Sequence, residues 1–506
     1  MKTKIKKKIL FLINQNEIYN VIEIAKRLES KFNLIFFITD LYSSYDKLRT
    51  NYKILKKKFP KSEIFDYHNE LKFLNSKKYD HKINFKFLKK FESKLFSNSI
   101  IQNFLKDIRL NNLYGYRGII YHPKNKKIYY KLINIVSKKI NYLFIKNKIK
   151  FVYSPDTINF TRNLIREICI IRKIPFYFVS YRIFDYLFLV NLSDIKNFKI
   201  MRQNKNKINN HKILEMKKKL INNSNIIEDS KKIIKFKKYI IIIFKILLYF
   251  SKKFIRNYLN YKKQQISKND LNYFDDKPTL NSNYYWLKKA ISIYPIQKYC
   301  LEDHEKKLKI IKKNKFIFYP LHITPEAGVY DQSELYDQLF LIQKISKKLP
   351  ADTLLVVKPH PSNFKEYTDI EDLDWYKSIN KIYNVVLLSH HVNVLYLIKK
   401  SLAVISVSGT ACLEANLMKK PSFLIGDTEF SGLYGIYNFQ NNFFEDIKNF
   451  NVKKLYKNNF YFNYIFDEAT KMNGYKYADF LTPSEDFAST KGQDAFNFFS
   501  KKLLKN

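Results

Sequence analysis

Three apolar runs in the C-terminal half of the chain are each followed at once by a polar motif, and this pattern constrains the fold most. The runs cover residues 316–319, 353–357 and 402–407. Short apolar runs that end at turn signals are typical of buried strands in a parallel sheet. The loops that follow such strands line the ligand crevice at one edge of the sheet. The pattern predicts an α/β domain over residues 310–440 that binds a phosphorylated ligand, most simply a nucleotide-sugar.

The third run leads into Ser408-Gly409-Thr410, which precedes a short expected helix. Glycine lets the backbone approach a ligand closely, and a helix N-terminus offers N–H donors and partial positive charge to phosphate. The alternative is an ordinary turn with a Ser/Thr N-cap. Five of the 9 glycines lie within residues 328–435, which favours the ligand site. Glu414, one turn beyond Thr410, would then accept hydrogen bonds from ribose hydroxyls, or else face solvent.

The second run ends at Lys358, and His360 follows between two prolines. A rigidly held imidazole suits a phosphate contact or protonation of a leaving group, because imidazole titrates near neutral pH. A structural turn histidine is the alternative. We expect both side chains to bind the donor.

His322 and Glu326 follow the first run. His322 would contact phosphate or acceptor, and Glu326 would be an acid, a base or a loop anchor. The residues alone do not separate these roles.

Two features superficially suggest a metal. His390 and His391 are adjacent, so their side chains point in different directions in a helix or a strand. Asp372 and Asp374 have DxD spacing but lie in an acidic stretch that reads as an exposed loop. We therefore expect neither a metal site nor a metal requirement.

Cysteine usage and the N-terminus both favour a cytoplasmic location. The three cysteines lie far apart, with no metal or disulfide spacing, and are Cys169, Cys300 and Cys412. Residues 1–8 resemble the basic start of a signal peptide. The apolar run that follows, residues 9–13, is shorter than the roughly 7–15 residues of a secretory core, so we interpret it as the first strand.

The net charge of +47 does not indicate a nucleic-acid partner. Lys, Asn, Ile, Phe and Tyr are abundant together, as in AT-rich coding sequences, and basic residues are scattered rather than clustered around a known module. Residues 315–445 carry 12 Lys, no Arg and 14 acidic residues, so the positive excess lies elsewhere. It would face an acceptor glycan or a membrane surface.

The N-terminal half, residues 1–192, reads as a second Rossmann-like domain. Residues 9–39 have the pattern strand–helix–strand, and residues 150–180 repeat it. The first loop lacks the glycines of a GxGxxG turn, so a conventional dinucleotide site is not expected there. Asp156 would cap the helix of the second unit or project into the cleft.

Residues 193–309 form a basic, mainly helical connection, and residues 441–506 a helical tail. Within the connection, residues 239–250 are apolar apart from Lys245. Twelve residues are too few for a membrane span, which needs roughly 20. They form either a buried inter-domain helix or a helix at a membrane interface, with flanking lysines on anionic headgroups.

Taken in order, these motifs resemble the capsule polysaccharide biosynthesis family. The resemblance rests on Tyr319-Pro-Leu-His-Ile-Thr-Pro-Glu326, Tyr336-Asp-Gln-Leu339, Leu349-Pro350, Lys358-Pro-His-Pro361 and Ser408-Gly-Thr-Ala411. It implies a GT-B-like architecture, in which two Rossmann-like domains face a cleft, with the donor on the C-terminal domain. It also implies similarity to retaining β-Kdo transferases, which use CMP-Kdo.

The resemblance assigns roles to several residues. His360 and the turn Ser408–Thr410 would hold the donor phosphate, and His322 and Glu326 would lie at the cleft edge. A retaining double displacement also needs a carboxylate nucleophile from the N-terminal domain. Asp156 and Asp185 are candidates, and retention or inversion stays open.

The expected function is a metal-independent glycosyltransferase without a cofactor. It would act on a capsule or other surface polysaccharide or glycolipid, in the cytoplasm or on the inner face of the membrane. A nucleotide-sugar epimerase of similar fold is one alternative. A non-enzymatic assembly or export component that binds lipid-linked glycan is another.

Overall fold

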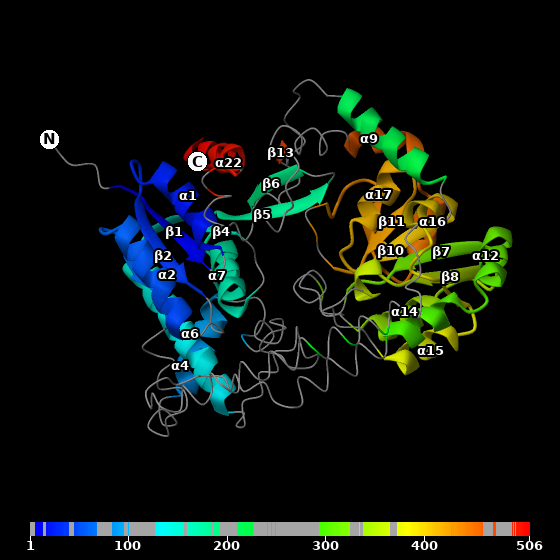
Figure 1. Cartoon of the computed structure of the whole chain (residues 1–506), viewed down its shortest axis with the longest axis horizontal. Coiled ribbons are helices and arrows are strands. Elements are labelled where there is room, and N and C mark those ends of the chain that lie inside the picture. Colours follow the sequence, from blue (N-terminus) through cyan, green and yellow to red (C-terminus); the bar gives the residue numbers. More distant parts are fainter. Residues whose placement is uncertain are drawn as a thin grey trace.

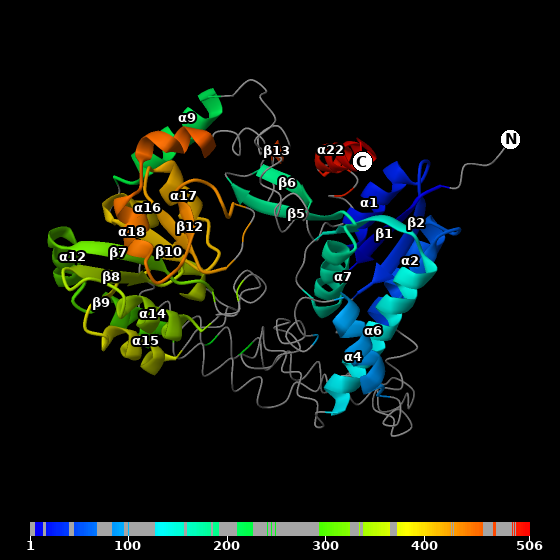
Figure 2. The same cartoon turned by 180° about the vertical axis from the view of Figure 1, so that it is seen from behind.

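A computed structural model places two α/β units next to each other, each built on one sheet (Figures 1 and 2). The structure describes residues 6–13, 17–39, 45–67, 83–95, 100, 127–155, 159–183, 186–191, 210–225, 240, 244, 248, 293–323, 333, 337–364, 372–426, 428, 430–458, 469–471, 488, 490 and 492–505.

The N-terminal unit contains a seven-stranded sheet of order β13-β6-β5-β4-β1-β2-β3. Five strands pair in parallel: β1 (Lys8–Ile13), β2 (Asn33–Ile38), β3 (Glu63–Phe65), β4 (Ile149–Ser154) and β5 (Phe176–Ile183). Two strands extend the edge in antiparallel pairing: β6 (Tyr186–Asn191) and β13 (Ala469–Lys471). The parallel part is doubly wound, because the strand order reverses between β1 and β4.

Alternation along the central strands divides the core of this unit into two layers. Ile9, Phe11 and Ile13 face one side and Leu10 and Leu12 the other, as the two-residue period of a strand requires. One face is covered by α1 (Ile18–Leu28), α2 (Tyr45–Lys58) and α22 (Gln493–Lys505). The other is covered by α4 (Phe85–Leu95), α6 (Lys127–Lys146) and α7 (Phe160–Ile171).

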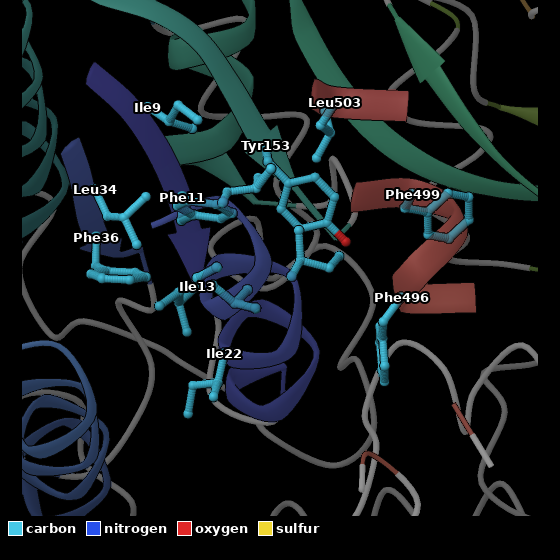
Figure 3. Packing of buried hydrophobic residues seen from close by; sticks show 14 of the residues in the cluster. Ile9, Phe11, Ile13, Ile22, Leu34, Phe36, Tyr153, Phe496, Phe499 and Leu503 are labelled. Atoms are coloured by element: carbon cyan, nitrogen blue, oxygen red, sulfur yellow. The ribbon is translucent and has the colours of Figure 1, made fainter. Parts of the chain in front are cut away.

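Helix α22 belongs to the N-terminal unit although it lies at the far end of the sequence. Its residues Phe496, Phe499 and Leu503 are buried in the same cluster as Phe11 and Tyr153. Figure 3 shows side chains of β1, β2, β4 and α22 gathered around Tyr153. The helix therefore completes a core that the first strands begin.

The C-terminal unit contains a six-stranded sheet of order β12-β11-β10-β7-β8-β9, with every pair parallel. Its strands are β7 (Lys315–Pro320), β8 (Thr353–Lys358), β9 (Val385–Leu387), β10 (Ala403–Ser406), β11 (Ser422–Leu424) and β12 (Ile436–Asn438). Numbered from β7, the order is 3-2-1-4-5-6, which is that of a Rossmann sheet.

Helices cover both faces of this sheet. One face carries α9 (Asn210–Asn223), α12 (His304–Lys313), α16 (Val394–Lys400) and α17 (Ala411–Leu417). The other carries α14 (Gln338–Ser346), α15 (Leu373–Asn380) and α18 (Phe443–Lys448). Short 3₁₀ helices, η5 (Pro361–Phe364) and η6 (Val452–Asn458), follow β8 and α18.

The predicted fold class, two Rossmann-like units, is confirmed. The apolar runs expected as strands at residues 9–13, 316–319, 353–357 and 402–407 correspond to β1, β7, β8 and β10. Two segments differ from the secondary structure expected for them. The tail contributes β13 to the N-terminal sheet. The stretch with Asp372 and Asp374, expected as a loop, begins helix α15, and Asp372 caps it by accepting from the Trp375 N–H at 2.9 Å.

The apolar segment 239–250 is described at three positions only. Ile240, Phe244 and Leu248 are helical and 50%, 62% and 46% exposed, so the face that carries them does not lie in the core. The rest of the segment lies outside the described residues. Among the helices that the structure describes, none is both long and apolar enough to cross a lipid bilayer.

Candidate functional site

The site predicted from the strand ends lies at the carboxyl edge of the C-terminal sheet. Strand β7 pairs with β10 on one side and with β8 on the other. The strand order reverses between β7 and β10, and the loops that diverge there leave a crevice in doubly wound proteins. His322 follows β7, and the turn with Ser408 and Gly409 follows β10. The structure thus brings together two motifs that are more than eighty positions apart.

The imidazole of His322 closes directly onto this turn. Its Nε2 lies 2.9 Å from Oγ of Ser406, the last residue of β10. The Gly409 N–H donates to the same Oγ at 3.1 Å, and the Ser408 N–H donates to Nε2 at 3.5 Å. Histidine, serine and turn therefore form one hydrogen-bonded unit.

Gly409 is required by this close approach. A Cβ at that position would lie 2.6 Å from Ser406 Oγ and 3.3 Å from His322 Cε1. A carbon atom and an oxygen atom that are not bonded to each other do not come as close as the first distance. A side chain at this position would therefore displace the serine or the imidazole. Glycine is therefore placed where the turn meets its partners.

Gln338 fixes the backbone of His322 from the first turn of α14. Its Oε1 accepts from the His322 N–H at 2.8 Å, and its Nε2 donates to the His322 carbonyl at 3.2 Å. The helix is capped by Asp337, which accepts from the Phe340 N–H at 3.1 Å. Sequence reasoning missed Gln338 as a site residue, although it lies in a motif, Tyr336-Asp-Gln-Leu339, that supported the family resemblance. Ser406 was also missed as a site residue, because it lies within an apolar run that indicates only a buried strand.

Glu414 lies on α17, one turn beyond Thr410, as predicted, and its N–H donates to the Thr410 carbonyl at 2.9 Å. Part of its side chain is accessible, yet the surrounding protein removes enough water to raise the pKa of the carboxyl to about 7. Thr410 is the N-cap residue of α17, but its side chain makes no capping hydrogen bond to that helix.

Lys358 and His360 follow the neighbouring strand β8. Lys358 is buried and His360 is exposed. The Ser362 N–H donates to His360 Nδ1 at 3.1 Å, and the Asn363 N–H donates to its carbonyl at 3.0 Å. The first bond orients the imidazole, and the second fixes the backbone of His360 at the start of η5.

The rings of His390 and His391 contact each other in a tilted arrangement. Their ring centroids are 3.9 Å apart, and the ring centroid of Phe364 lies 4.2 Å from that of His390. Burial, with the nearby charges of His391 and Lys358, lowers the pKa of His390 to about 3, so this ring is neutral at physiological pH. Within the described part of the chain, no group of three or more His, Cys, Asp or Glu side chains could hold a metal ion.

The carboxylates expected to act in catalysis are not placed. Glu326, Asp156 and Asp185 lie outside the described residues. The helix that Asp156 was expected to cap is capped instead by Asn159, whose side chain accepts from the Arg162 N–H at 2.9 Å. Asn159 has the extended backbone that an N-cap needs, directly before the first helical residue.

The N-terminal sheet has a buried polar layer at its own carboxyl edge, which sequence reasoning missed. Arg162 on α7 and Glu17 before α1 form a buried ion pair, with Nη1 to Oε1 at 3.1 Å. Beside it, Asn159 donates to Thr39 at 3.3 Å. Tyr67 and Thr161 share a hydrogen bond of 3.1 Å. No sequence signal pairs these residues, because they come from separate loops and helices.

The chain was compared with models of known protein families. Residues 255–477 match the family model described as capsule polysaccharide biosynthesis protein. The predicted resemblance to this family is confirmed. This capsule-synthesis segment, residues 255–477, contains all six strands of the C-terminal sheet and every site residue described on it. A search of curated proteins found no match.

Solved structures similar to this chain share little sequence with it. KpsC of Thermosulfurimonas dismutans, a β-Kdo 2,7 transferase, is 16% identical over 29% of this chain, with a TM-score of 0.20. The match spans about half, 51%, of the length of that protein. A UDP-GlcNAc 2-epimerase of Neisseria meningitidis, bound to UDP-GlcNAc, is 12% identical, with a TM-score of 0.22. That match covers 99% of this chain and 100% of the epimerase.

Proposed function

We propose that this chain is a glycosyltransferase that transfers a sugar from a nucleotide-sugar to a capsule polysaccharide, another surface polysaccharide or a glycolipid. The observation that carries the proposal is the closure of His322 onto the Ser408-Gly409 turn, at the strand-order reversal of a Rossmann-type sheet. This arrangement lies inside the capsule-synthesis segment. It combines a tight backbone turn with hydroxyl and imidazole groups, which suit a phosphorylated ligand.

The donor phosphate would bind at the carboxyl ends of β10, β7 and β8, which are neighbours in the sheet. Lys358 and His360 would supply positive charge and hydrogen-bond donors, and Ser408 and Thr410 would supply hydroxyls. The segment 315–445 has nearly balanced charge, so the field that favours an anion would come from these groups and not from a generally basic surface. Glu414 would accept hydrogen bonds from the ribose, and because its pKa is about 7 it is partly ionised near neutral pH.

The reaction would replace the bond between the anomeric carbon and the donor phosphate by a bond to an acceptor hydroxyl. In a retaining double displacement, a carboxylate first attacks the anomeric carbon while nucleotide leaves, and the acceptor oxygen then displaces the carboxylate. Glu326, Asp156 and Asp185 are our candidates for this carboxylate. We propose a CMP-linked, Kdo-like donor. We also propose that Lys358 and His360 stabilise the leaving phosphate without a metal ion.

The test is calorimetric titration of the full chain with CMP, UDP and GDP. One nucleotide should bind, and both His360→Ala and Gly409→Val should weaken its binding at least tenfold, a loss of about 1.4 kcal/mol. Tyr383→Ala is the matched control, because Tyr383 is fully exposed and precedes β9 at the opposite end of the sheet. Equal binding by all four proteins would contradict the proposed site.

Two other functions would be recognised by different experimental results. Conversion of a nucleotide-sugar into its epimer without an acceptor would identify an epimerase. A folded protein that binds glycan but no nucleotide would identify an assembly or export component.

A further inference from the structure

The loop that follows β11 lies beside the proposed phosphate turn. The Gly426 N–H donates to the Val407 carbonyl at 2.8 Å, and Val407 directly precedes Ser408. This bond extends the parallel pairing of β10 with β11 past the ends of both strands. We call the described residues of 425–435 the β11 loop. Its first residues therefore run alongside the chain that enters the turn, at the carboxyl edge of the sheet.

The far end of the β11 loop is held by a segment from beyond α18. Asn458, the last residue of η6, bonds both backbone groups of Tyr434: its Oδ1 accepts from the N–H at 3.0 Å, and its Nδ2 donates to the carbonyl at 2.8 Å. A backbone N–H can only donate and a carbonyl can only accept, so these bonds fix the orientation of the amide. The Asn451 N–H donates to the Tyr434 hydroxyl at 2.9 Å, and the Phe450 ring stacks on the tyrosine ring with 6.0 Å between centroids. We call Phe450, Asn451 and Asn458 the clasp.

The clasp also reaches α17, the helix that begins after the turn. Asn458 Nδ2 donates to Asn416 Oδ1 at 2.9 Å, and Asn416 Nδ2 donates to the Tyr434 carbonyl at 2.7 Å. Both asparagines are 3% exposed, so water does not readily replace these bonds. The β11 loop and α17 are thus tied to one side chain, that of Asn458.

Gly435 shows how closely the loop, α17 and the clasp meet. Its φ of +80° is a conformation that favours glycine. A Cβ at this position would lie 2.6 Å from Phe450 Cε2 and 3.1 Å from Asn416 Nδ2. Any side chain would therefore push the clasp and the loop apart.

We propose that Asn458 is a positioning residue for the donor site, which holds the β11 loop against α17 so that the loop is ordered beside the turn before the ligand arrives. This deepens the proposed function and rests on it for the ligand, a nucleotide-sugar. A loop that is already ordered loses little conformational entropy when the ligand binds, so the clasp raises affinity. Asn458 acts through Tyr434 and Asn416 and does not itself have to touch the ligand.

The ordering of the loop is tested without any ligand. The Thr428 and Ser431 amides bond within the β11 loop and not to Asn458, so their hydrogen exchange reports the loop itself. Exchange is followed by mass spectrometry, resolved to single residues by electron-transfer fragmentation. Asn458→Ala should accelerate exchange at both amides about tenfold, with β7 and β8 unchanged. Unchanged exchange in the loop would overturn the proposal.

Asn384→Ala is the matched control for Asn458→Ala. The Asn384 amide also bonds two groups of one residue, since its Nδ2 donates to the Ser346 carbonyl at 3.0 Å and its Oδ1 accepts from the Ser346 hydroxyl. It precedes β9, at the opposite end of the same sheet. The control should leave the exchange of the β11 loop unchanged. Equal acceleration in both variants would mean that general loosening of the unit, and not Asn458, frees the loop, which contradicts the proposal.

The effect on binding is tested by titration of the folded variants with CMP, UDP and GDP. Asn458→Ala should weaken binding of the nucleotide that the wild type selects by about tenfold, and Asn384→Ala should leave it unchanged. Asn458→Asp keeps the size of the side chain and the acceptor for the Tyr434 N–H but lacks the N–H donors. It should therefore weaken binding too, and it keeps the test open if the alanine variant does not fold.

A role in stability alone would lower the free energy of unfolding of the Asn458 variants and leave the affinity of the folded protein at the wild-type value, which would overturn the proposal. A double-mutant cycle adds a second criterion. Asn416→Ala and Asn458→Ala break one network, so their combined effect on affinity should be less than the sum of the two. Additive effects would contradict the shared network. If the wild type binds no nucleotide, the proposed function fails, while hydrogen exchange still decides whether Asn458 orders the loop.

Discussion

At the scale of single residues, the fold changes the titration of the site residue Glu414. Its pKa is about 7 in the folded chain against an ordinary value of 4.5, because burial disfavours the carboxylate. The folded state therefore holds the proton more tightly. The stability from this group is fully present below pH 4.5 and is lost as the pH rises through about 7.

Glu414→Gln should remove this dependence. The variant should gain stability relative to wild type as the pH rises from 4.5 to 7, by at most about 3 kcal/mol, since partial exposure screens the effect. Urea unfolding of both proteins at several pH values measures the difference. Parallel pH profiles would show that desolvation of Glu414 is not significant.

The buried pair of Arg162 and Glu17 gives a second residue-scale prediction. Arg162→Met should cost about 3–5 kcal/mol, because it leaves the Glu17 carboxylate buried without its partner, and Arg162→Met with Glu17→Gln should recover much of the loss. Asp352→Asn is the control, since its pair with Lys315 is exposed and should contribute less than about 1 kcal/mol. Additive effects of the two core substitutions in a double-mutant cycle would argue against the pair.

At the scale of elements, the positions of strands could be predicted from the sequence, but the long-range contacts between elements could not. Apolar runs such as residues 316–319 and 353–357 are local signals, and they gave β7 and β8. The first residue of a helix was harder to predict. Asp156 and Asn159 are both suitable N-cap residues, and only the backbone geometry selects Asn159. Contacts between distant positions, such as His322 with Ser406, leave no periodic signal in one sequence.

Helix α22 is the element whose contribution is most readily measured. Phe499→Ala should destabilise the N-terminal unit by about 3–5 kcal/mol, because a fully buried aromatic ring leaves a cavity beside Tyr153. Phe340→Ala is the control, because Phe340 is 49% exposed. Hydrogen exchange should show weaker protection in β1 and β4 and unchanged protection in β7 and β8. Uniform loss over both sheets would contradict packing of α22 on the first unit alone.

At the scale of the whole molecule, the two units are held together by a side-chain contact as well as by the connecting chain. Phe178 on β5 packs against the core cluster of each unit. Phe178→Ala should therefore weaken the contact between units and increase the radius of gyration measured by small-angle X-ray scattering, with each sheet intact by circular dichroism. An unchanged radius would mean that Phe178 does not hold the units together.

The return of α22 to the first sheet also sets when this protein can finish folding on the ribosome. Strands β1 and β2 emerge early, but the helix that covers one of their faces is translated only after the whole C-terminal unit. At ordinary elongation rates this interval is on the order of tens of seconds. The nascent N-terminal unit thus presents an incompletely covered apolar layer throughout that time.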